Sequence, residues 1–311
     1  MRTIYLQKDC PADLAASVAT IGFFDGVHRG HQFLISHVVE TAREEGRQSM
    51  IITFDQHPRE VLHADYQPRL LTPLQEKLYL LERTGVDVVA VLHFDVALSQ
   101  LSARDFMHDL LLERLHVAKL FIGYDHFGHN RAEGFTDYVA YGREMGMEVV
   151  QNPVFELEGV NVSSTVCRRH VAAGEMEAAS RCLGYPYRMG GRVVAGFQEG
   201  RKLGFPTANI QLADPRRLVP ASGVYAVRVK IDDEATWRLG MMNIGTRPTF
   251  DGEKVSLEVH IFDFAGDLYG CQVEVAFLRR VREERKFASP EELAAQLARD
   301  KQTILDACCL S

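Results

Sequence analysis

The chain has 311 residues, 46% of them hydrophobic and 25% charged, and a net charge of −7. This length and composition predict a globular protein of about two domains, and the acidic balance without a basic tract argues against a nucleic-acid partner. No apolar run reaches the length of a membrane span and the N-terminus lacks the apolar core of a signal peptide, so no membrane partner is expected. Six scattered cysteines without a C-x-x-C pair favour reduced thiols and a cytoplasmic location.

Short apolar runs and helical patterns alternate over the first half of the chain. Leu34, Val38 and Ala42 recur at helical spacing, and Thr72-Pro73-Leu74-Gln75 has the pattern of a capping box at a helix start. The runs predict strands at Ser17–Gly22, Ser49–Phe54, Val86–Leu92, Val117–Gly123 and Met147–Gln151, and helices from about Gly30, from Thr72 to about Thr84, from Ser102 to about Leu115 and over Gly134–Met145. The alternation predicts a parallel sheet with helices on both faces, which binds ligands at the carboxyl ends of its strands.

The pattern changes near Tyr185, after a helical segment at Thr165–Cys182. Apolar and polar residues then alternate with a period of two at Tyr225–Ile231, Val255–Phe262 and Val273–Phe277, which predicts an antiparallel sheet or a small barrel. Ser289-Pro290-Glu291-Glu292 has the pattern of another capping box and predicts a final helix that runs to about Asp306. We therefore expect an α/β domain at residues 1–185 and a β-rich domain at residues 186–311.

The string Gly22-Phe23-Phe24-Asp25-Gly26-Val27-His28-Arg29-Gly30-His31 directly follows the first predicted strand. Gly22 and Gly26 permit tight turns, and Gly30 lies where a helix begins, so backbone amides there can face a phosphate. His28 and His31 flank that point and can donate hydrogen bonds to phosphate oxygens as negative charge builds up. A lone histidine would more often only pack or cap a turn, but this pair in this string favours a nucleotide site.

A second glycine-rich string contains Gly200-Arg201-Lys202-Leu203-Gly204-Phe205-Pro206-Thr207-Ala208-Asn209. It is not a Walker loop, because no G-K-[ST] follows the glycines. The glycines let the backbone wrap an anionic ligand, and the Thr207 hydroxyl and the Asn209 amide offer oxygen ligands to Mg²⁺ beside phosphates. The alternative is a glycine-rich hairpin with a buried threonine and asparagine. The two strings together predict two phosphate-handling sites in two domains.

The first string resembles the H-x-G-H signature of the nucleotidyltransferase superfamily. Its form F-D-G-V-H-x-G-H is similar to the adenylyltransferase half of bacterial bifunctional riboflavin kinase/FAD synthetases. Phe54-Asp55-Gln56-His57-Pro58 resembles that family's F-D-P-H-P with glutamine in place of proline, and Ser163-Ser164-Thr165 followed by Arg168 resembles its S-S-T box. The second string resembles the riboflavin kinase signature G-R-x-L-G-F-P-T-A-N.

One box departs from the family pattern. Gly123-Tyr124-Asp125-His126-Phe127-Gly128 is one residue shorter than the family's G-x-D-F-R-F-G and lacks its arginine, for which Arg131 is a candidate substitute. The other boxes follow in the family's order from Gly22 to about Asp300, so the resemblance covers nearly the whole chain.

The resemblance implies an N-terminal Rossmann-like nucleotidyltransferase domain and a C-terminal antiparallel β-barrel kinase domain with a terminal helix. Riboflavin and ATP would give FMN and ADP at the C-terminal site, and FMN and ATP would give FAD and pyrophosphate at the N-terminal site, both with Mg²⁺. At the N-terminal site the resemblance implies catalytic roles for His28 and His31. It implies ATP binding there by Gly22, Phe24, Asp25, Gly30, Asp125, Ser164, Thr165 and Arg168.

At the C-terminal site the resemblance implies that Glu258 is the base that accepts the proton of the riboflavin 5′-hydroxyl. Taken alone, Glu258 would be an exposed residue on the polar side of a strand. The resemblance implies ATP binding by Gly200, Lys202, Gly204, Thr207 and Asn209, with Thr207 and Asn209 also holding the metal, and flavin binding by Arg282 and Arg285. The segment Asn243–Thr249 resembles a further family box and is expected to line this site.

Two alternatives stay open at this point. The short box at Gly123–Gly128 is compatible with a riboflavin kinase whose adenylyltransferase domain is weak or inactive. A flavin-sensing protein without catalysis is the second alternative, against which the intact His28, His31 and Glu258 argue. In either case the expected partners are the small molecules riboflavin, FMN and ATP.

Overall fold

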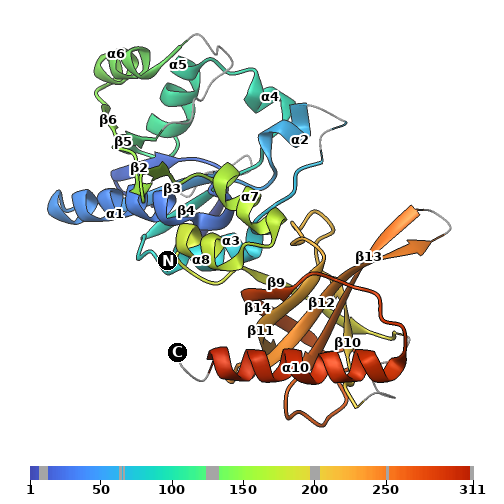
Figure 1. The fold of residues 1–311 in the computed structure, drawn as a ribbon. Coiled ribbons are helices and arrows are strands. Elements are labelled where there is room, and N and C mark those ends of the chain that lie inside the picture. Colours follow the sequence, from blue (N-terminus) through green and yellow to red (C-terminus); the bar gives the residue numbers. More distant parts are fainter. Residues whose placement is uncertain are drawn as a thin grey trace. The chain divides into compact units, whose positions relative to one another are not determined.

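The computed structural model describes residues 1–6, 13–62, 65, 67–123, 133–196, 204–249 and 252–308. The chain forms two compact units, Met1–Ser164 and Thr165–Ser311 (Figure 1). Each unit has a sheet and a hydrophobic core of its own. In the part of the chain that is described, no helix combines the length and the apolar character needed to cross a membrane.

The first unit is built on a six-stranded parallel sheet with the order β1-β4-β3-β2-β5-β6. Its strands are β1 (Arg2–Leu6), β2 (Ser17–Ile21), β3 (Gln48–Phe54), β4 (Val88–Leu92), β5 (Val117–Ile122) and β6 (Glu148–Gln151). All residues of β2 and β4 are buried, as expected for strands with both faces covered. The predicted parallel sheet is confirmed, and β1, which no apolar run predicted, extends it beside β4.

Helices cover both faces of this sheet (Figure 1). On one face, α1 (Arg29–Glu44) and α3 (Leu74–Glu82) pack in a cluster that contains Ile51 of β3. On the other face, the cluster that contains Ile52 is completed by α5 (Ala103–Asp105), the π-helical segment Phe106–Leu112 and α6 (Phe135–Met145). Successive residues of a strand therefore enter opposite cores, as the pleat requires. Short elements complete the unit: η1 (Asp25–Val27), α2 (Pro58–Leu62), α4 (Val96–Ser99), β7 (Glu156–Leu157) and β8 (Val160–Asn161).

Three of the motif segments begin at one edge of this sheet. Gly22 follows β2, Asp55 follows β3 and Gly123 follows β5, and these three strands are parallel neighbours with β2 in the middle. The chain runs from β2 to β3 on one side and returns to β5 on the other, which makes the β2/β5 boundary a topological switch point. Open α/β sheets bind ligands at the carboxyl ends of the strands at such a point.

The second unit is a closed six-stranded antiparallel barrel with the order β10-β13-β12-β11-β14-β9. Its strands are β9 (Arg188–Val194), β10 (Ala208–Leu212), β11 (Gly223–Ile231), β12 (Arg238–Thr249), β13 (Gly252–Ile261) and β14 (Gln272–Arg282). The terminal helix α10 (Pro290–Cys308) packs on the outer face of the barrel, where Ile304 joins Met241 and Phe262 in one cluster (Figure 1). The antiparallel sheet predicted from the period-two alternation is confirmed as a barrel.

Two helices, α7 (Ser164–Ala173) and α8 (Met176–Leu183), precede the barrel. The sequence predicts one helical segment here, but Gly174 has a φ of +77° and separates the two helices. A Cβ at Gly174 would lie 2.5 Å from the Tyr225 hydroxyl oxygen, so glycine is required both for its backbone and for this close approach.

The structural border between the units lies ahead of the change in sequence pattern. The helix α8 contacts β14, and Glu177 pairs there with Arg279 at 3.5 Å. The units therefore divide between Ser164 and Thr165, whereas the alternation pattern places the domain boundary at residues 185/186.

Of the two helix caps predicted from the sequence, the one at Thr72 is wrong and the one at Ser289 is confirmed. The helix α3 begins with Pro73 at the N-cap and has no side-chain cap, because the Thr72 hydroxyl instead accepts a hydrogen bond from the Gly26 amide at 2.9 Å. At the start of α10, the Ser289 hydroxyl accepts the hydrogen bond of the Glu292 amide at 3.2 Å, as the sequence predicts.

Candidate active sites

The loop after β2 is a strained turn that leads directly into α1. Phe24 and Val27 have positive φ angles of 54° and 34°, and Gly26 has a φ of 80°. A positive φ is rare for any residue with a side chain and rarest for a β-branched one, so the surroundings must hold Val27 in this conformation. Phe24 and Val27 are 2% and 1% exposed and belong to the core beneath the loop, which supplies that restraint. The predicted ATP-binding residue Phe24 thus packs its ring inward.

His28 is the N-cap of α1, and its ring is oriented by the helix that it caps. The Nδ1 atom accepts a hydrogen bond from the His31 amide at 3.2 Å, so in the neutral ring the proton is on Nε2. The His31 ring stacks on it with a centroid distance of 3.5 Å. A Cβ at Gly30 would lie 2.9 Å from the Val162 carbonyl oxygen and 3.2 Å from the His28 ring, so only glycine lets these groups meet. The structure thus brings His28, Gly30 and His31 together at a helix start.

Asp25 locks this loop to the segment before α3. Asp25 is 1% exposed, and its carboxylate accepts hydrogen bonds from the Leu71 amide at 3.0 Å and the Thr72 amide at 2.9 Å. The Asp25 carbonyl oxygen also accepts a hydrogen bond from the Ser164 hydroxyl at 3.0 Å. The predicted ATP-binding residues Asp25 and Ser164 are therefore joined to each other, and the Asp25 carboxylate is directed at protein backbone.

The remaining residues predicted to bind ATP at the N-terminal site are Gly22, Thr165, Arg168 and Asp125. Gly22 donates its amide hydrogen bond to Ile52 of the neighbouring strand at 3.1 Å. Thr165 and Arg168 follow Ser164 on α7 and belong to the second unit. Asp125, and with it most of the short box, lies outside the described residues. The roles of these residues in ATP binding stay predictions.

Lys77 is a buried lysine behind the first site, and no sequence motif pointed to it. It is 1% exposed, and Nζ donates to the carbonyl oxygens of Phe23 and Phe54, both at 2.9 Å, and to the Thr53 hydroxyl at 3.0 Å. It also lies 4.2 Å from the centre of the Phe23 ring. Lys77 therefore ties the end of β2 to the end of β3. The sequence signal was a lysine on the buried face of α3, beside Leu78 and Leu81.

Replacing Lys77 by methionine is expected to destabilise the first unit by about 3 kcal/mol, because a buried carbonyl that loses its donor costs about 1–3 kcal/mol. Trp237 is the one tryptophan of the chain and lies in the second unit, so its fluorescence reports the barrel alone. We expect an earlier transition in far-ultraviolet circular dichroism and an unchanged transition in tryptophan fluorescence. Two unchanged transitions would contradict a structural role for Lys77.

The same variant has a pH signature. Burial lowers the pKa of Lys77 from 10.5 to about 7, against Asp25 and Asp55, which raise it. Between pH 7 and about 10 the unfolded chain therefore keeps a proton that the folded chain releases, and the contribution of Lys77 to the stability of the folded state rises with pH. Unfolding of the wild-type protein at several pH values should show this rise relative to the methionine variant.

The second candidate site is a row of polar side chains across the outer face of the barrel. Glu258 of β13 is paired in register with Asn209 of β10 on one side and with Asn243 of β12 on the other. Residues directly opposite in an antiparallel sheet point to the same face, so these three side chains form one row. Val259, the next residue of β13, is 1% exposed and faces the barrel interior. Sequence reasoning assigned Glu258 and Asn209 to the site and left Asn243 only as part of a box.

Thr207 completes this row from the glycine-rich string. Its hydroxyl lies 3.5 Å from the Glu258 carboxylate, although 51 residues separate them in the sequence. A Cβ at Gly196 would overlap the Asn209 carboxamide, so glycine there makes room for this side chain. Gly204 has a φ of +79°, which favours glycine. Gly200 and Lys202, the other predicted ATP-binding residues, lie outside the described residues.

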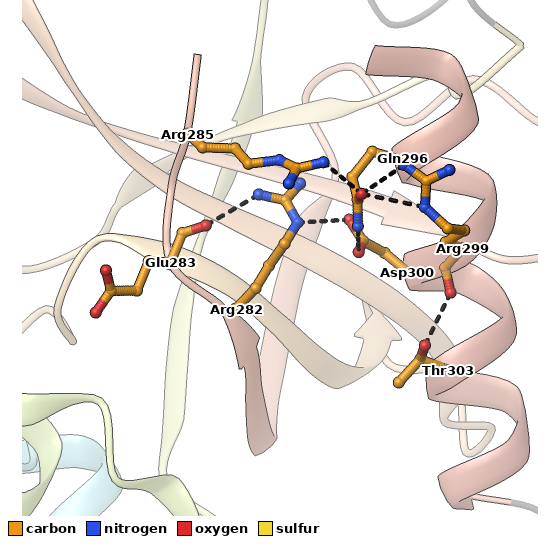
Figure 2. A network of polar contacts seen from close by, with 7 residues as sticks. All are labelled: Arg282, Glu283, Arg285, Gln296, Arg299, Asp300 and Thr303. Carbon is orange, nitrogen blue, oxygen red and sulfur yellow. Dashed lines mark hydrogen bonds and ion pairs between the residues drawn. The ribbon is translucent and has the colours of Figure 1, made fainter. Parts of the chain in front are cut away.

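Arg282 and Arg285, the predicted flavin-binding residues, join the end of β14 to α10 (Figure 2). Arg282 Nε donates to the carboxylate of Asp300 at 2.9 Å, and Asp300 is 2% exposed. Gln296 donates to the other oxygen of that carboxylate at 2.7 Å and accepts a hydrogen bond from Arg285 (Figure 2). The Arg282 guanidinium thus pairs with a buried carboxylate and holds the terminal helix, while Arg285 is exposed at the edge of the network.

The two sites define a class of protein. A parallel sheet that presents paired histidines at a helix start, and a barrel that presents a carboxylate beside a threonine and two asparagines, are the parts of a two-domain nucleotide-dependent transferase.

Comparisons with known proteins agree with this class. The FAD synthetase family matches residues 10–166 and the riboflavin kinase family matches residues 183–308. The bifunctional riboflavin kinase/FMN adenylyltransferase of Escherichia coli strain K12 is 42% identical over 97% of this chain and 96% of its own length, and that of Pseudomonas fluorescens is 43% identical over 91% and 90%. The chain belongs to the family of bifunctional riboflavin kinase/FMN adenylyltransferases. It is a transferase with one domain for each activity.

The fold also matches a solved structure over nearly its full length. A crystal structure described as a macrolide-efflux protein from Streptococcus pneumoniae is 34% identical, with a TM-score of 0.89, and covers 98% of this chain and 99% of that one. The name applies to that protein, and the likeness concerns the two-domain fold.

Proposed function

We propose that the barrel phosphorylates riboflavin to FMN with the residues of the polar row, and that the N-terminal site then converts FMN to FAD. Glu258 accepts the proton of the riboflavin 5′-hydroxyl as that oxygen attacks the γ-phosphorus of ATP, and ADP leaves. The observation that carries this assignment is the 3.5 Å approach of the Thr207 hydroxyl to the Glu258 carboxylate, which unites two distant segments at one point.

Thr207 and Asn209 are the residues that would hold Mg²⁺ at the kinase site. The hydroxyl and the amide oxygen are hard ligands of the kind that Mg²⁺ prefers, and phosphates commonly complete its coordination. The carboxylate of Glu258 beside Thr207 favours a cation at this point. When bound, Mg²⁺ would neutralise charge on the phosphates. The chain's own task is to hold the hydroxyl, the amide and the base in one row.

At the N-terminal site, His28 and His31 stabilise the charge that develops as the FMN phosphate attacks the α-phosphorus of ATP and pyrophosphate leaves. The Nε2 proton of His28 follows from the hydrogen bond at Nδ1, and Gly30 lets the Val162 carbonyl and the His28 ring meet at the start of α1. A helix start favours the negative charge of a phosphate. Asp25, Phe24 and Lys77 act through the loop by holding its backbone. Ser164, whose hydroxyl donates to the Asp25 carbonyl, contacts ATP beside this loop. Thr165 and Arg168 are assigned to ATP binding by their resemblance to the family's S-S-T box alone. We place the functional boundary at residues 185/186, so that α7 and α8 belong to the adenylyltransferase half of the sequence.

We also infer a cytoplasmic location. Cys167, Cys182 and Cys271 are free thiols, which suits a reducing compartment. The proposed substrates, riboflavin, FMN and ATP, are small molecules available there.

Incubation of the purified protein with riboflavin, ATP and Mg²⁺ is expected to give FMN first and FAD later, as followed by chromatography of the flavins. Removal of Mg²⁺ by a chelator should stop both steps. Replacing Thr207 by valine keeps the shape of the side chain and removes its oxygen. We expect this variant to need about tenfold more Mg²⁺ for FMN formation, since one lost ligand costs about 1.4 kcal/mol or more.

The FAD step in the same protein is the control for the valine variant. Its Mg²⁺ requirement should not change, because Thr207 lies in the barrel. FMN that accumulates without FAD would contradict an active N-terminal site. Flavin that binds without turnover would contradict both assignments.

A further inference from the structure

Thr207 is held on both sides by the strand that carries Glu258. On its C-terminal side, Ala208 is paired in register with Val259 of β13. On its N-terminal side, the Pro206 carbonyl accepts a hydrogen bond from Nδ1 of His260 at 2.8 Å. The backbone around Thr207 is therefore fixed relative to β13 by one ladder pair and by one side chain.

His260 is built into the outer face of the barrel for this contact. It lies two residues after Glu258 and therefore on the same face of β13. It is 8% exposed, and its ring packs against Phe205 with a centroid distance of 5.4 Å and against Phe262 with one of 5.7 Å. The cross-strand partner of His260 is Met241 of β12. Apart from the Pro206 carbonyl, these neighbours are apolar, so packing fixes the ring while the hydrogen bond gives it a direction.

The protonation of His260 follows from its partners. A carbonyl oxygen can only accept, so Nδ1 carries the proton. Burial lowers the pKa of His260 and Lys301 lowers it further, while the bond to Pro206 and the charge of Asp263 raise it. The neutral ring with its proton on Nδ1 is the form that this environment selects.

We propose that His260 is a positioning residue of the riboflavin kinase reaction, which holds the Pro206–Thr207 peptide so that the Thr207 hydroxyl stays beside Glu258. This inference rests on the proposed roles of Thr207 and Glu258. Pro206 is exposed, so its carbonyl can turn to water when the histidine bond is lost. The barrel ladder would then remain, and Thr207 alone would shift.

Three substitutions separate the hydrogen bond from the packing. Asparagine can place an amide N–H near the position of Nδ1, glutamine places it one bond farther out, and leucine supplies bulk without a donor. We expect His260→Leu to lower the rate of FMN formation at limiting Mg²⁺ by up to about tenfold, the effect expected for removing the Thr207 hydroxyl itself. His260→Asn should recover most of the rate, and His260→Gln should resemble leucine.

FAD formation from supplied FMN in the same preparations serves as the control and should stay unchanged. Equal rates for His260→Asn and His260→Gln would overturn the proposal, whether both are low or both are like wild type. This contrast decides the matter even when His260→Leu does not fold. Glu258→Gln, assayed in the same experiment, distinguishes failure of the proposed kinase site from failure of the proposed role of His260. If Glu258→Gln keeps full FMN formation, the proposed site itself fails. If it abolishes FMN formation while every His260 variant is normal, only the role of His260 fails.

Discussion

Replacing Glu258 by glutamine is expected to lower kcat for FMN formation about 10³-fold, within the range of about 10²–10⁴ that a general base contributes. Glutamine has the same size as glutamate, and the pairing of β13 with β10 and β12 holds its backbone in the same place. The amide cannot accept the proton of the riboflavin hydroxyl. FAD formation from supplied FMN should be unchanged. Chromatography of the flavins, started once from riboflavin and once from FMN, measures both steps.

Glu274→Gln is the matched control for this experiment. Glu274 lies on β14 of the same barrel and pairs with Arg188 at 3.1 Å, with 36% of its side chain exposed. An exposed ion pair of this kind contributes about 0–1 kcal/mol, so both activities should be retained. Normal FMN formation by Glu258→Gln would exclude Glu258 as the base. Loss of both activities in folded protein would contradict two separate sites.

Replacing His28 by asparagine is expected to lower kcat for FAD formation about 10²–10³-fold, the effect of removing one hydrogen-bond donor to a developing negative charge. Asparagine is a preferred N-cap residue and can accept the His31 amide as Nδ1 does now, so α1 should remain capped. The Nε2 donor is lost, because the shorter side chain ends before it. His28→Asn combined with His31→Ala should remove detectable FAD formation. FMN formation from riboflavin should be unchanged in both variants.

His108→Asn is the control for the histidine variants. His108 lies on the π-helical segment, with 51% of its side chain exposed, and pairs with Asp109 at 2.7 Å. Neither activity should respond to this change. If His28→Asn still forms FAD at the wild-type rate, the histidine is only a helix cap. Circular dichroism distinguishes loss of the Nε2 donor from loss of the helix cap and the fold. The spectrum of His28→Asn should match that of the wild-type protein.

The predictable part of the fold was the part encoded by short-range periodicity. β4 is a continuous apolar run because both of its faces are covered, and the second half of β11, Val227–Ile231, alternates because only one face lies inside the barrel. The strand β1 escaped prediction because it has no apolar run of its own, with Arg2 and Tyr5 exposed. The capping box at Thr72 failed because a partner 46 residues away, the Gly26 amide, takes its hydroxyl. Local pattern carries no information about such a partner.

Backbone freedom was visible in the sequence only where glycine marks it. Gly30 was expected at a helix start, and the structure adds the reason, which is the approach of the Val162 carbonyl. Gly174 lies inside a helical sequence pattern, and its left-handed conformation divides that pattern into α7 and α8. A glycine in a sequence does not show whether the helix continues or ends there, because the residues that pack around it determine its conformation.

For the sites, the sequence suggests which residues carry the chemistry, and the tertiary structure sets their geometry. Motif patterns point to His28, His31 and Thr207, and the family resemblance adds Glu258; their roles stay predictions. Strand register then aligned Asn243 with Glu258 and Asn209, because hydrogen bonds between strands, which no local period specifies, decide which residues stand opposite each other. Burial likewise turned the Asp25 carboxylate toward the backbone of residues 71–72 and Arg282 toward Asp300, because a charge removed from water must find its partner inside the fold.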